Sequence, residues 1–338
     1  MPDILATASP VRIEATVADL LRGAQDREPW KAADSLSGSR FERTTIEGEP
    51  YVVKYLCVDD DWLMRASGDL HCRQLTLMAS SVLKSLPAAI DHTVVACAPY
   101  MSERGHRGAA VLMRDVSGEL VATGSAPISL DAHRRFLRHM AQMHAAYMGF
   151  EDTVGLFPMA HHYVILNPVM AELEIAAGSR DPVPRAAREG WEAIAAGHPA
   201  VSKTLRALAA DPSPLTAALR TGPLTLVHGD WKLGNLGAHP NGDTILLDWD
   251  RVGAGAPLID LAWYLAVNCD RLPESKESAI AAYRASLEAA GIGTAGWWDR
   301  QLGAALSGAF LQLAWSKAGD VAEFTWWSDR LNEAMPLS

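Results

Sequence analysis

The sequence predicts an α+β protein with two lobes, a small strand-rich lobe at residues 1–116 and a larger helical lobe at residues 117–338. A chain of 338 residues is too long for one small core. Residues 39–58 read as strands, and the stretches HTVVACAPYM and AAVLMRDV, which ends at Val116, are further strand candidates. Beyond Val116 the pattern becomes helical, as in LDAHRRFLRHMAQMHAAYM, where apolar side chains recur at helical spacing.

Composition excludes several classes of protein. The net charge of −10 argues against a nucleic-acid or anionic-membrane partner and permits a cationic substrate, although acidity that only aids solubility is the plainer interpretation. No apolar run reaches the roughly 18 residues of a membrane span. The four cysteines are scattered and the N-terminus lacks a basic leader pattern, so we expect a cytoplasmic protein with reduced thiols. The oligomeric state stays open.

Two hairpins are predicted from turn residues. RFERTTIEGEPYVVKYL reads as two strands joined at Glu47-Gly48-Glu49. NLGAHPNGDTILLDWD reads as a second hairpin, turning at Pro240-Asn241-Gly242, which returns Asp248 to the neighbourhood of Asn235. Between them, residues 59–87 are expected to form one helix with acids at its start and a proline beyond its end.

The stretch LVHGDWKLGNLG places a dense set of polar side chains directly after a buried strand. With the second hairpin formed, the side chains of Asp230, Asn235 and Asp248 converge. Clustered acids repel each other unless a cation or a reacting proton resolves the conflict. Oxygen ligands from an Asn and an Asp suit Mg²⁺, which binds few protein groups beside substrate phosphates. Asp230 is then available to accept a proton from a hydroxyl nucleophile.

The pattern D-x-K-x-x-N, formed by Asp230, Lys232 and Asn235 with Asp248 thirteen residues later, resembles the catalytic loop and metal-binding Asp of protein kinases. HGD in place of HRD, and DWD in place of DFG, resemble the aminoglycoside phosphotransferase family, which includes choline-kinase-like enzymes. The runs DRVGAGAPLIDLAWYL, LMRDV and MAQMHAAYM resemble further motifs of that family. The resemblance extends from about residue 35 to the C-terminal helices and implies a protein-kinase-like fold.

This resemblance implies a Mg²⁺-dependent phosphotransferase that moves the γ-phosphoryl group of ATP or GTP to a hydroxyl of a small molecule. Asp230 would be the base, Asn235 and Asp248 would hold the metal, and Lys232 would neutralise phosphate charge. Lys232 as an ordinary solvated loop lysine is the alternative.

The nucleotide side is predicted around Lys54. Strand alternation puts Val52 and Lys54 on one face of their strand. The family's lysine at this position binds the α- and β-phosphates, whereas an edge-strand lysine that blunts aggregation is the alternative. By resemblance alone, backbone groups around Arg114 and Val116 would bind the base.

Two features depart from the protein-kinase pattern. No G-x-G-x-x-G precedes Lys54, and the stretch DSLSGSRFER contains a single glycine, Gly38, flanked by Ser35, Ser37 and Ser39. Such a Ser-rich turn can still offer backbone N–H groups and hydroxyls to phosphates, and Ser39 is the candidate. The expected helix Glu is also missing. From Trp62 to Leu86 the only acid is Asp69, which is either the partner of Lys54 or a solvated or capping acid.

Other residues around the loop carry structural expectations. Asp260 is expected to accept hydrogen bonds from loop backbone N–H groups, His228 to orient the loop, and His144 to be packed or hydrogen-bonded in its helix. Trp231 has the best case among the tryptophans for contact with substrate, against the alternative of a core position.

The acceptor is not readable from the sequence. An aminoglycoside or another hydroxylated antibiotic is one class, and a sugar, an amino alcohol or a nucleoside are the alternatives. A catalytically silent protein that only binds nucleotide or ligand is the rival from another class, motivated by the missing helix Glu. A kinase acting on proteins is disfavoured because only eleven residues separate Asp248 from Asp260, too few for an activation segment that docks a peptide.

Overall fold

The computed structural model describes residues 11–31 and 37–335. Contacts divide the chain into two compact units that are discontinuous in sequence. The first comprises the described residues up to Gly124 together with Thr153–Leu156 and Leu233–Val252, and the second comprises the remainder. The hairpin of residues 235–248, expected with the helical lobe, therefore belongs by its contacts to the strand-rich unit.

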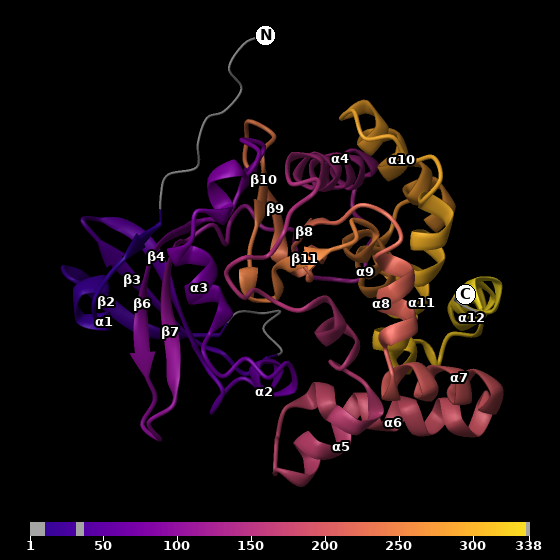
Figure 1. Cartoon of the computed structure of the whole chain (residues 1–338). Coiled ribbons are helices and arrows are strands. Elements are labelled where there is room, and N and C mark those ends of the chain that lie inside the picture. The colour runs from indigo at the N-terminus through magenta and orange to yellow at the C-terminus, as the bar shows by residue number, and fades with distance from the viewer. Residues whose placement is uncertain (1–10, 32–36, 336–338) are drawn as a thin grey trace. The chain divides into compact units, whose positions relative to one another are not determined.

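The first unit is built on a twisted six-stranded sheet with the strand order β1-β6-β7-β4-β3-β2 (Figure 1). All neighbours are antiparallel except β1 and β6. The strands are β1 (Arg12–Ile13), β2 (Ala24–Trp30), β3 (Arg40–Ile46), β4 (Glu49–Cys57), β6 (Val94–Met101) and β7 (Arg107–Arg114).

The predicted hairpin around Gly48 is confirmed as β3 and β4. Its loop consists of Glu47 and Gly48, both at positive φ, which matches the right-handed twist of the strands in a two-residue turn. Lys54 pairs with Phe41 on one side and Val111 on the other, so it lies in an interior strand. The edge-strand alternative for Lys54 is thereby removed.

Strand β4 separates the apolar core from the opposite face of the sheet. Val53 and Tyr55 belong to a buried cluster with Leu20 and small residues of β6 and β7. Because side chains alternate along a strand, Val52 and Lys54 point to the other face, as the sequence predicts. That face carries the cavity described below.

The prediction of a single helix over residues 59–87 is wrong. The chain forms α2 (Trp62–Ala66), α3 (Arg73–Ala79) and a 3₁₀ turn, Val82–Ser85. Gly68 and Cys72 both have positive φ, which ends one helix and delays the start of the next. The only other α-helix of this unit among the described residues is α1 (Val17–Leu20).

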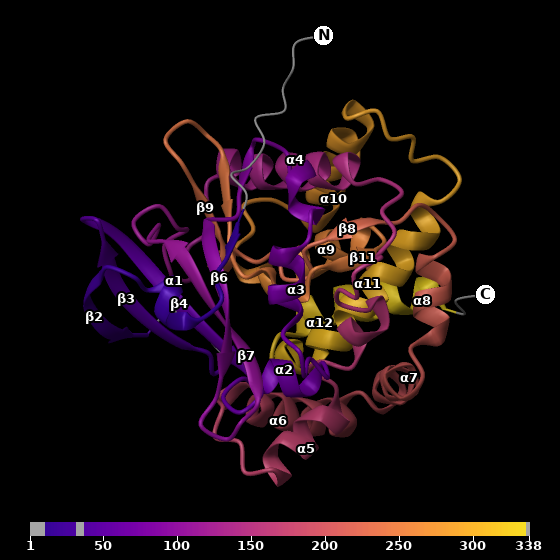
Figure 2. The same ribbon diagram turned by 60° about the vertical axis from the view of Figure 1, so that its left-hand side comes forward.

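The second predicted hairpin forms a separate three-stranded sheet in the same unit. β9 (Leu236–Ala238) and β10 (Thr244–Leu246) are antiparallel, and β10 pairs in parallel with β5 (Ile90–Asp91). The N–H of Leu247 donates to the carbonyl of Asn235 at 2.9 Å, so the two ends of the hairpin lie together. Figure 2 shows this hairpin beside the label of β9.

The second unit is mainly helical. Its predicted helix at residues 130–148 is confirmed. Its helices are α4 (Leu130–Ala146), α5 (Pro168–Ala176), α6 (Pro182–Gly197), α7 (Pro199–Ala210), α8 (Ser213–Leu219), α9 (Leu258–Val267), α10 (Lys276–Ala289), α11 (Trp298–Lys317) and α12 (Val321–Ala334), with 3₁₀ turns at Met159–Tyr163 and Cys269–Arg271.

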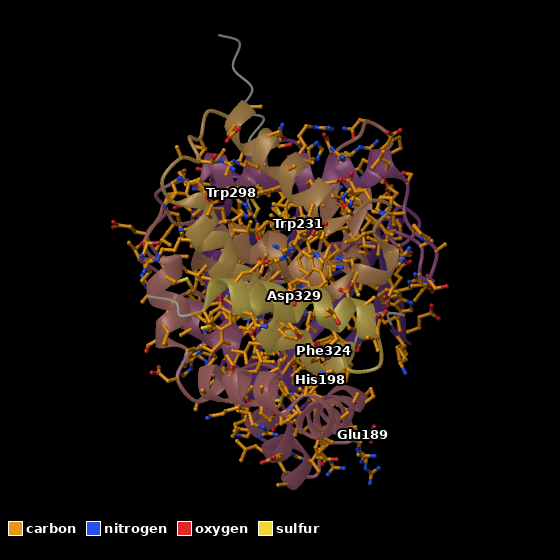
Figure 3. All side chains as sticks on the ribbon, turned by 90° about the vertical axis from the view of Figure 1, so that its right-hand side faces the viewer. Glu189, His198, Trp231, Trp298, Phe324 and Asp329 are labelled. Atoms are coloured by element: carbon orange, nitrogen blue, oxygen red, sulfur yellow. The ribbon has the colours of Figure 1, made fainter. Side chains whose placement is uncertain are left out.

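Helix α11 is the centre of this unit and packs against α6, α8, α9 and α12. It is apolar on most of its circumference, which is typical of a buried helix. Between α7 and α12, the imidazole of His198 stacks on Phe324 with ring centroids 4.1 Å apart (Figure 3).

The strand that precedes the Asp230 loop is β8 (Thr225–Val227), which pairs antiparallel with β11 (Gly253–Gly255). A Cβ atom at Gly253 would lie 2.0 Å from the carbonyl oxygen of Phe157, so this position requires glycine. Among the described residues, no helix is long and apolar enough to cross a membrane.

Candidate active site

A cavity of about 410 Å³ lies in the first unit and is lined only by residues of that unit. Its apolar lining includes Trp30, Phe41, Val52, Met113, Val116 and Leu247. Its polar lining includes Lys54, Asn235 and Asp248. The structure thus brings together three predicted site residues from two separate parts of the sequence. Arg114 and Val116, the predicted base-binding positions, line the same cavity.

Lys54 is the most tightly held charge at the cavity. It is 3% exposed and forms an ion pair with Asp248, and Asp250 lies 3.8 Å away. Burial alone would lower the pKa of the Lys54 ammonium, but Asp248, Asp250 and Asp61 outweigh burial and raise that pKa above its ordinary value. Lys54 is therefore a fixed positive charge at any physiological pH.

Asp61 is an acid near Lys54 that the sequence pattern did not single out. It caps α2, accepting N–H groups of Leu63 and Met64 at 2.8 and 3.2 Å. Burial raises the pKa of this carboxyl, while Lys54 and the hydroxyl of Ser39 oppose the rise. Ser39 donates to Asp61 at 2.6 Å. Ser39 thus holds the carboxylate of Asp61 near Lys54. Its role as a phosphate contact stays a prediction. Ser35 lies outside the described residues.

The predicted pairing of Asp69 with Lys54 is not what the structure shows. Asp69 instead accepts the backbone N–H of Arg73 with both carboxylate oxygens, at 3.0 and 2.9 Å, where α3 begins. Burial raises the pKa of Asp69, and the N–H of Arg73 opposes that rise. The alternative of a capping acid is therefore the correct one. Because the helix breaks at Gly68, Asp69 lies at the N-terminal end of the next helix, α3.

The hairpin that carries Asn235 and Asp248 is fastened to the linker that follows β7. His239 contacts Glu119 through Nδ1 at 2.6 Å and Asp91 through Nε2 at 2.7 Å. Asp91 also pairs with the guanidinium of Arg114. Leu120 and Gly237 form an isolated antiparallel bridge. Arg114, predicted as a base-binding position, thus contacts this hairpin anchor through its side chain, by way of Asp91.

The His239 anchor predicts a pH-dependent stability. Burial would lower the pKa of His239, but Asp91 and Glu119 outweigh it and raise that pKa. A raised folded-state pKa gives stability that is fully present below the unfolded value of about 6.5 and is lost as pH rises through the folded value. We expect wild type to exceed His239→Gln in stability by on the order of 1 kcal/mol or less at acidic pH, with the difference shrinking above neutrality. Thermal unfolding across pH measures it; a constant difference would contradict the anchor.

Asp248 has a backbone conformation that few residues adopt. Its φ is 68°, in the left-handed region, which Asp and Asn tolerate better than other non-glycine residues. Such conformations persist where the surrounding structure imposes them, and they concentrate at functional sites. Here the conformation directs the carboxylate to Lys54.

The donor set of Asn235 and Asp248 fits Mg²⁺. One amide oxygen and one carboxylate are the few hard oxygen ligands that this ion takes from a protein when phosphates supply others. In the described ranges, 11–31 and 37–335, no group of three or more His, Cys, Asp or Glu side chains could hold a metal ion. Asn235 and Asp248 would therefore supply only part of the ligands of a bound Mg²⁺ ion.

The second unit holds the loop with Asp230, whose backbone is fixed by Asp260. Asp260 is fully buried on α9 and accepts the N–H groups of His228 and Gly229, each at 2.7 Å. Its carboxylate also lies 3.1 Å from Nε2 of His144, whose Nδ1 is 2.6 Å from the hydroxyl of Tyr283. Burial would raise the pKa of Asp260, but His144 and the loop hold it below its usual range. The expected roles of Asp260 and His144 are confirmed.

The carboxylate of Asp230 is bound on both oxygens. The indole N–H of Trp263 donates to Oδ1 at 2.9 Å, and the ammonium of Lys232 lies 2.9 Å from Oδ2. The backbone N–H of Asp230 donates to Nδ1 of His228 at 3.2 Å. The structure therefore brings Asp230 and Lys232 together, as the sequence predicts, and gives His228 an orienting contact.

Trp231 is fully buried in the second unit (Figure 3). Its ring lies edge-on to His228, with centroids 6.2 Å apart. The core alternative thus describes its position better than a substrate wall. Trp263, Trp298 and Trp327 are buried as well.

A family model described as the phosphotransferase enzyme family matches residues 74–298, more than half of the chain. The chain belongs to this family. It is a phosphotransferase. No curated protein matches the chain.

Several solved structures are similar to this phosphotransferase. A microcompartment-associated aminopropanol kinase is 13% identical with a TM-score of 0.51, covering 95% of this chain and 98% of its own. A choline kinase from Streptococcus pneumoniae is 14% identical with a TM-score of 0.48, at 94% and 96% coverage. An aminoglycoside-3′-phosphotransferase of type VIII is 18% identical with a TM-score of 0.48, at 88% and 96% coverage. The predicted two-lobed kinase-like α+β fold is confirmed.

Two residues near the charged groups of the site, Asp61 and Trp263, were not predicted from the sequence, although a local signal for each was present. Asp61 stands immediately before Trp62, the usual place of a helix N-cap. Trp263 follows Asp260 by three residues, so both side chains lie on one face of α9. Trp30, at the end of β2, gave no comparable signal, because a cavity lining depends on the whole sheet.

Proposed function

We propose that this phosphotransferase transfers the γ-phosphoryl group of Mg²⁺-bound ATP, or GTP, to the hydroxyl of a small molecule. The observation that carries the proposal is the ion pair between buried Lys54 and partly exposed Asp248, at a cavity that Asn235 also lines. A cavity with both aromatic lining and a fixed cation suits a ligand that joins a flat base to phosphates.

The nucleotide side follows from the two kinds of lining. Trp30 and Phe41 meet edge to face with centroids 5.9 Å apart and, with Met113, offer apolar surface to a base. Lys54, permanently charged, would contact the α- and β-phosphates. The choice between ATP and GTP depends on backbone groups near Arg114 and Val116, and competition binding measures it.

Asn235 and Asp248 would hold the magnesium ion. Bound Mg²⁺ neutralises phosphate charge and so lowers the barrier to attack by an alcohol. Lys54 and the magnesium ion would compete for the Asp248 carboxylate. Once phosphates enter, Lys54 can bind phosphate oxygens in place of that carboxylate. Asp250 keeps a carboxylate within 3.8 Å of the lysine.

Asp230 would accept the proton of the acceptor hydroxyl as its oxygen attacks the γ-phosphoryl group. A carboxylate oxygen has two lone pairs, so Oδ2 can bond Lys232 and still receive this proton. Lys232 would stabilise the charge that spreads over the transferred group. We place the reaction in the cytoplasm, consistent with four cysteines that form no disulfide.

The acceptor would be an aminoglycoside or another hydroxylated antibiotic, with amino alcohols, sugars and nucleosides as the other classes to screen. The net charge of −10 is compatible with a cationic acceptor. Incubation with Mg²⁺ and ATP, followed by mass spectrometry for the gain of one phosphoryl group, identifies it. Nucleotide binding with no transfer to any class and no ATP hydrolysis would instead support the silent binding protein.

Lys232→Ala is expected to lower kcat by on the order of 10²-fold, about 2.7 kcal/mol in the barrier. The reason is its 2.9 Å contact with Asp230 on the loop that serves the reaction, which a solvated lysine would not make. Nucleotide affinity should change much less, because Lys232 is outside the cavity lining. Steady-state kinetics beside a nucleotide titration measure both quantities.

Lys203→Ala is the matched control, since Lys203 is an exposed lysine of α7 in the same unit. Equal kcat values for the two variants would leave Lys232 as surface charge. A loss confined to nucleotide affinity would make it a ground-state phosphate clamp.

A further inference from the structure

One face of α9 holds the Asp230 loop at two points. Asp260 fixes the loop backbone through the N–H groups of His228 and Gly229. One turn later on the same helix, Trp263 reaches the side chain of Asp230 itself, at 2.9 Å from Oδ1. Backbone and carboxylate are therefore oriented by the same rigid element.

Trp263 has the properties of a positioning group. Its side chain is 5% exposed, and eight other residues of α9, from Leu258 to Ala266, are buried as well, so the indole has little freedom to move. An indole N–H only donates, so it can bond the carboxylate oxygen but cannot take the proton that Asp230 receives. A donor to an ionised acceptor also gives a stronger hydrogen bond than a neutral pair.

We propose that Trp263 is a positioning residue for Asp230: its indole N–H fixes the carboxylate so that Oδ2 is presented to the acceptor hydroxyl. Oδ1 is then occupied by a group that stays in place throughout the reaction, and Lys232 bonds Oδ2 from the other side. The inference rests on the proposed role of Asp230 as the base. It assigns Trp263, which lies 33 positions after Asp230 in the chain, to the positioning of that base.

Trp263→Phe tests the inference because it removes the N–H and keeps an aromatic ring. We expect kcat to fall by at least about 10-fold, the effect of losing one hydrogen bond to a charged group. The KM for nucleotide should stay unchanged. The acidic limb of the kcat–pH profile should move to higher pH, because the lost donor bonded the ionised carboxylate in preference to the protonated one.

Trp191→Phe is the matched control. Trp191 is buried in the same unit and its indole donates at 2.9 Å to the carbonyl of Leu166, so the same chemical change is made away from Asp230. This variant should keep the kcat and the pH profile of wild type even where its unfolding temperature falls. If Trp263→Phe does not fold, benzothienylalanine at position 263 keeps the bicyclic shape and still lacks the N–H.

Equal kcat and pH profiles for the position-263 and Trp191→Phe variants would overturn the inference, as would a loss confined to the KM for nucleotide. Those outcomes leave the proposed function intact, because wild type still transfers phosphoryl groups. A wild-type protein that transfers none, or an Asp230→Asn variant that keeps full turnover, would overturn the proposed function and this inference with it.

Discussion

Asp230→Asn is expected to reduce kcat by roughly 10²- to 10⁴-fold, the usual contribution of a positioned general base. An amide keeps the shape of the carboxylate and can still accept the indole N–H of Trp263 through its oxygen, so the loop should remain folded. It cannot accept the proton of the attacking hydroxyl. Nucleotide affinity should persist, since the cavity lining includes no residue of this loop before Gly234.

Steady-state kinetics and a calorimetric nucleotide titration measure the two effects of Asp230→Asn. The control is Asp329→Asn, an exposed acid on α12 (Figure 3), which should behave as wild type. Turnover of Asp230→Asn close to that of the control would remove Asp230 from the reaction.

Asp248→Ala is expected to abolish productive binding of Mg²⁺-nucleotide, because the doubly charged ion loses its main carboxylate. The substitution also costs backbone energy, roughly 1–2 kcal/mol, since Ala tolerates the φ of 68° poorly. Asp248→Asn separates the two effects: it tolerates the backbone and removes only the charge. We expect both variants to lose the Mg²⁺-dependent part of nucleotide affinity, measured by calorimetry with and without Mg²⁺.

Asp250→Ala is the comparison for Asp248. Asp250 lies 3.8 Å from Lys54 and is absent from the cavity lining, so its loss should be milder. The reverse order of effects would mean that the metal-binding role belongs to Asp250. An unchanged Mg²⁺ dependence in all three variants would place the ion elsewhere.

Local signals in the sequence were sufficient for much of the fold. The turns at Gly48 and at residues 240–242 fixed two hairpins, because few residues adopt the conformations such turns need. The alternation around Lys54 correctly gave the cavity face of β4. The hairpin predicted from its turn residues places Asn235 and Asp248 at the same end, and the N–H of Leu247 bonds the carbonyl of Asn235. Lys232, two residues after Asp230, contacts its carboxylate.

Features that depend on distant parts of the chain were not predictable in the same way. The helix break at Gly68 places Asp69 at the start of α3 and not beside Lys54. This break was not predicted, because the residues on both sides have a helical pattern. The hairpin with Asp248 belongs to the strand-rich unit because β10 pairs with β5, which is some 150 residues earlier. Trp263 becomes informative only when the position of Asp230 is known.

The most direct test of the proposed function is the mass of the acceptor after incubation of wild type and Asp230→Asn with Mg²⁺, ATP and each acceptor class. We expect that one small-molecule class gains a single phosphoryl group with wild type, in step with ADP formation, and that Asp230→Asn binds ATP while leaving the acceptor unmodified. A wild-type protein that binds no Mg²⁺-nucleotide, or equal phosphorylation by both proteins, would contradict it.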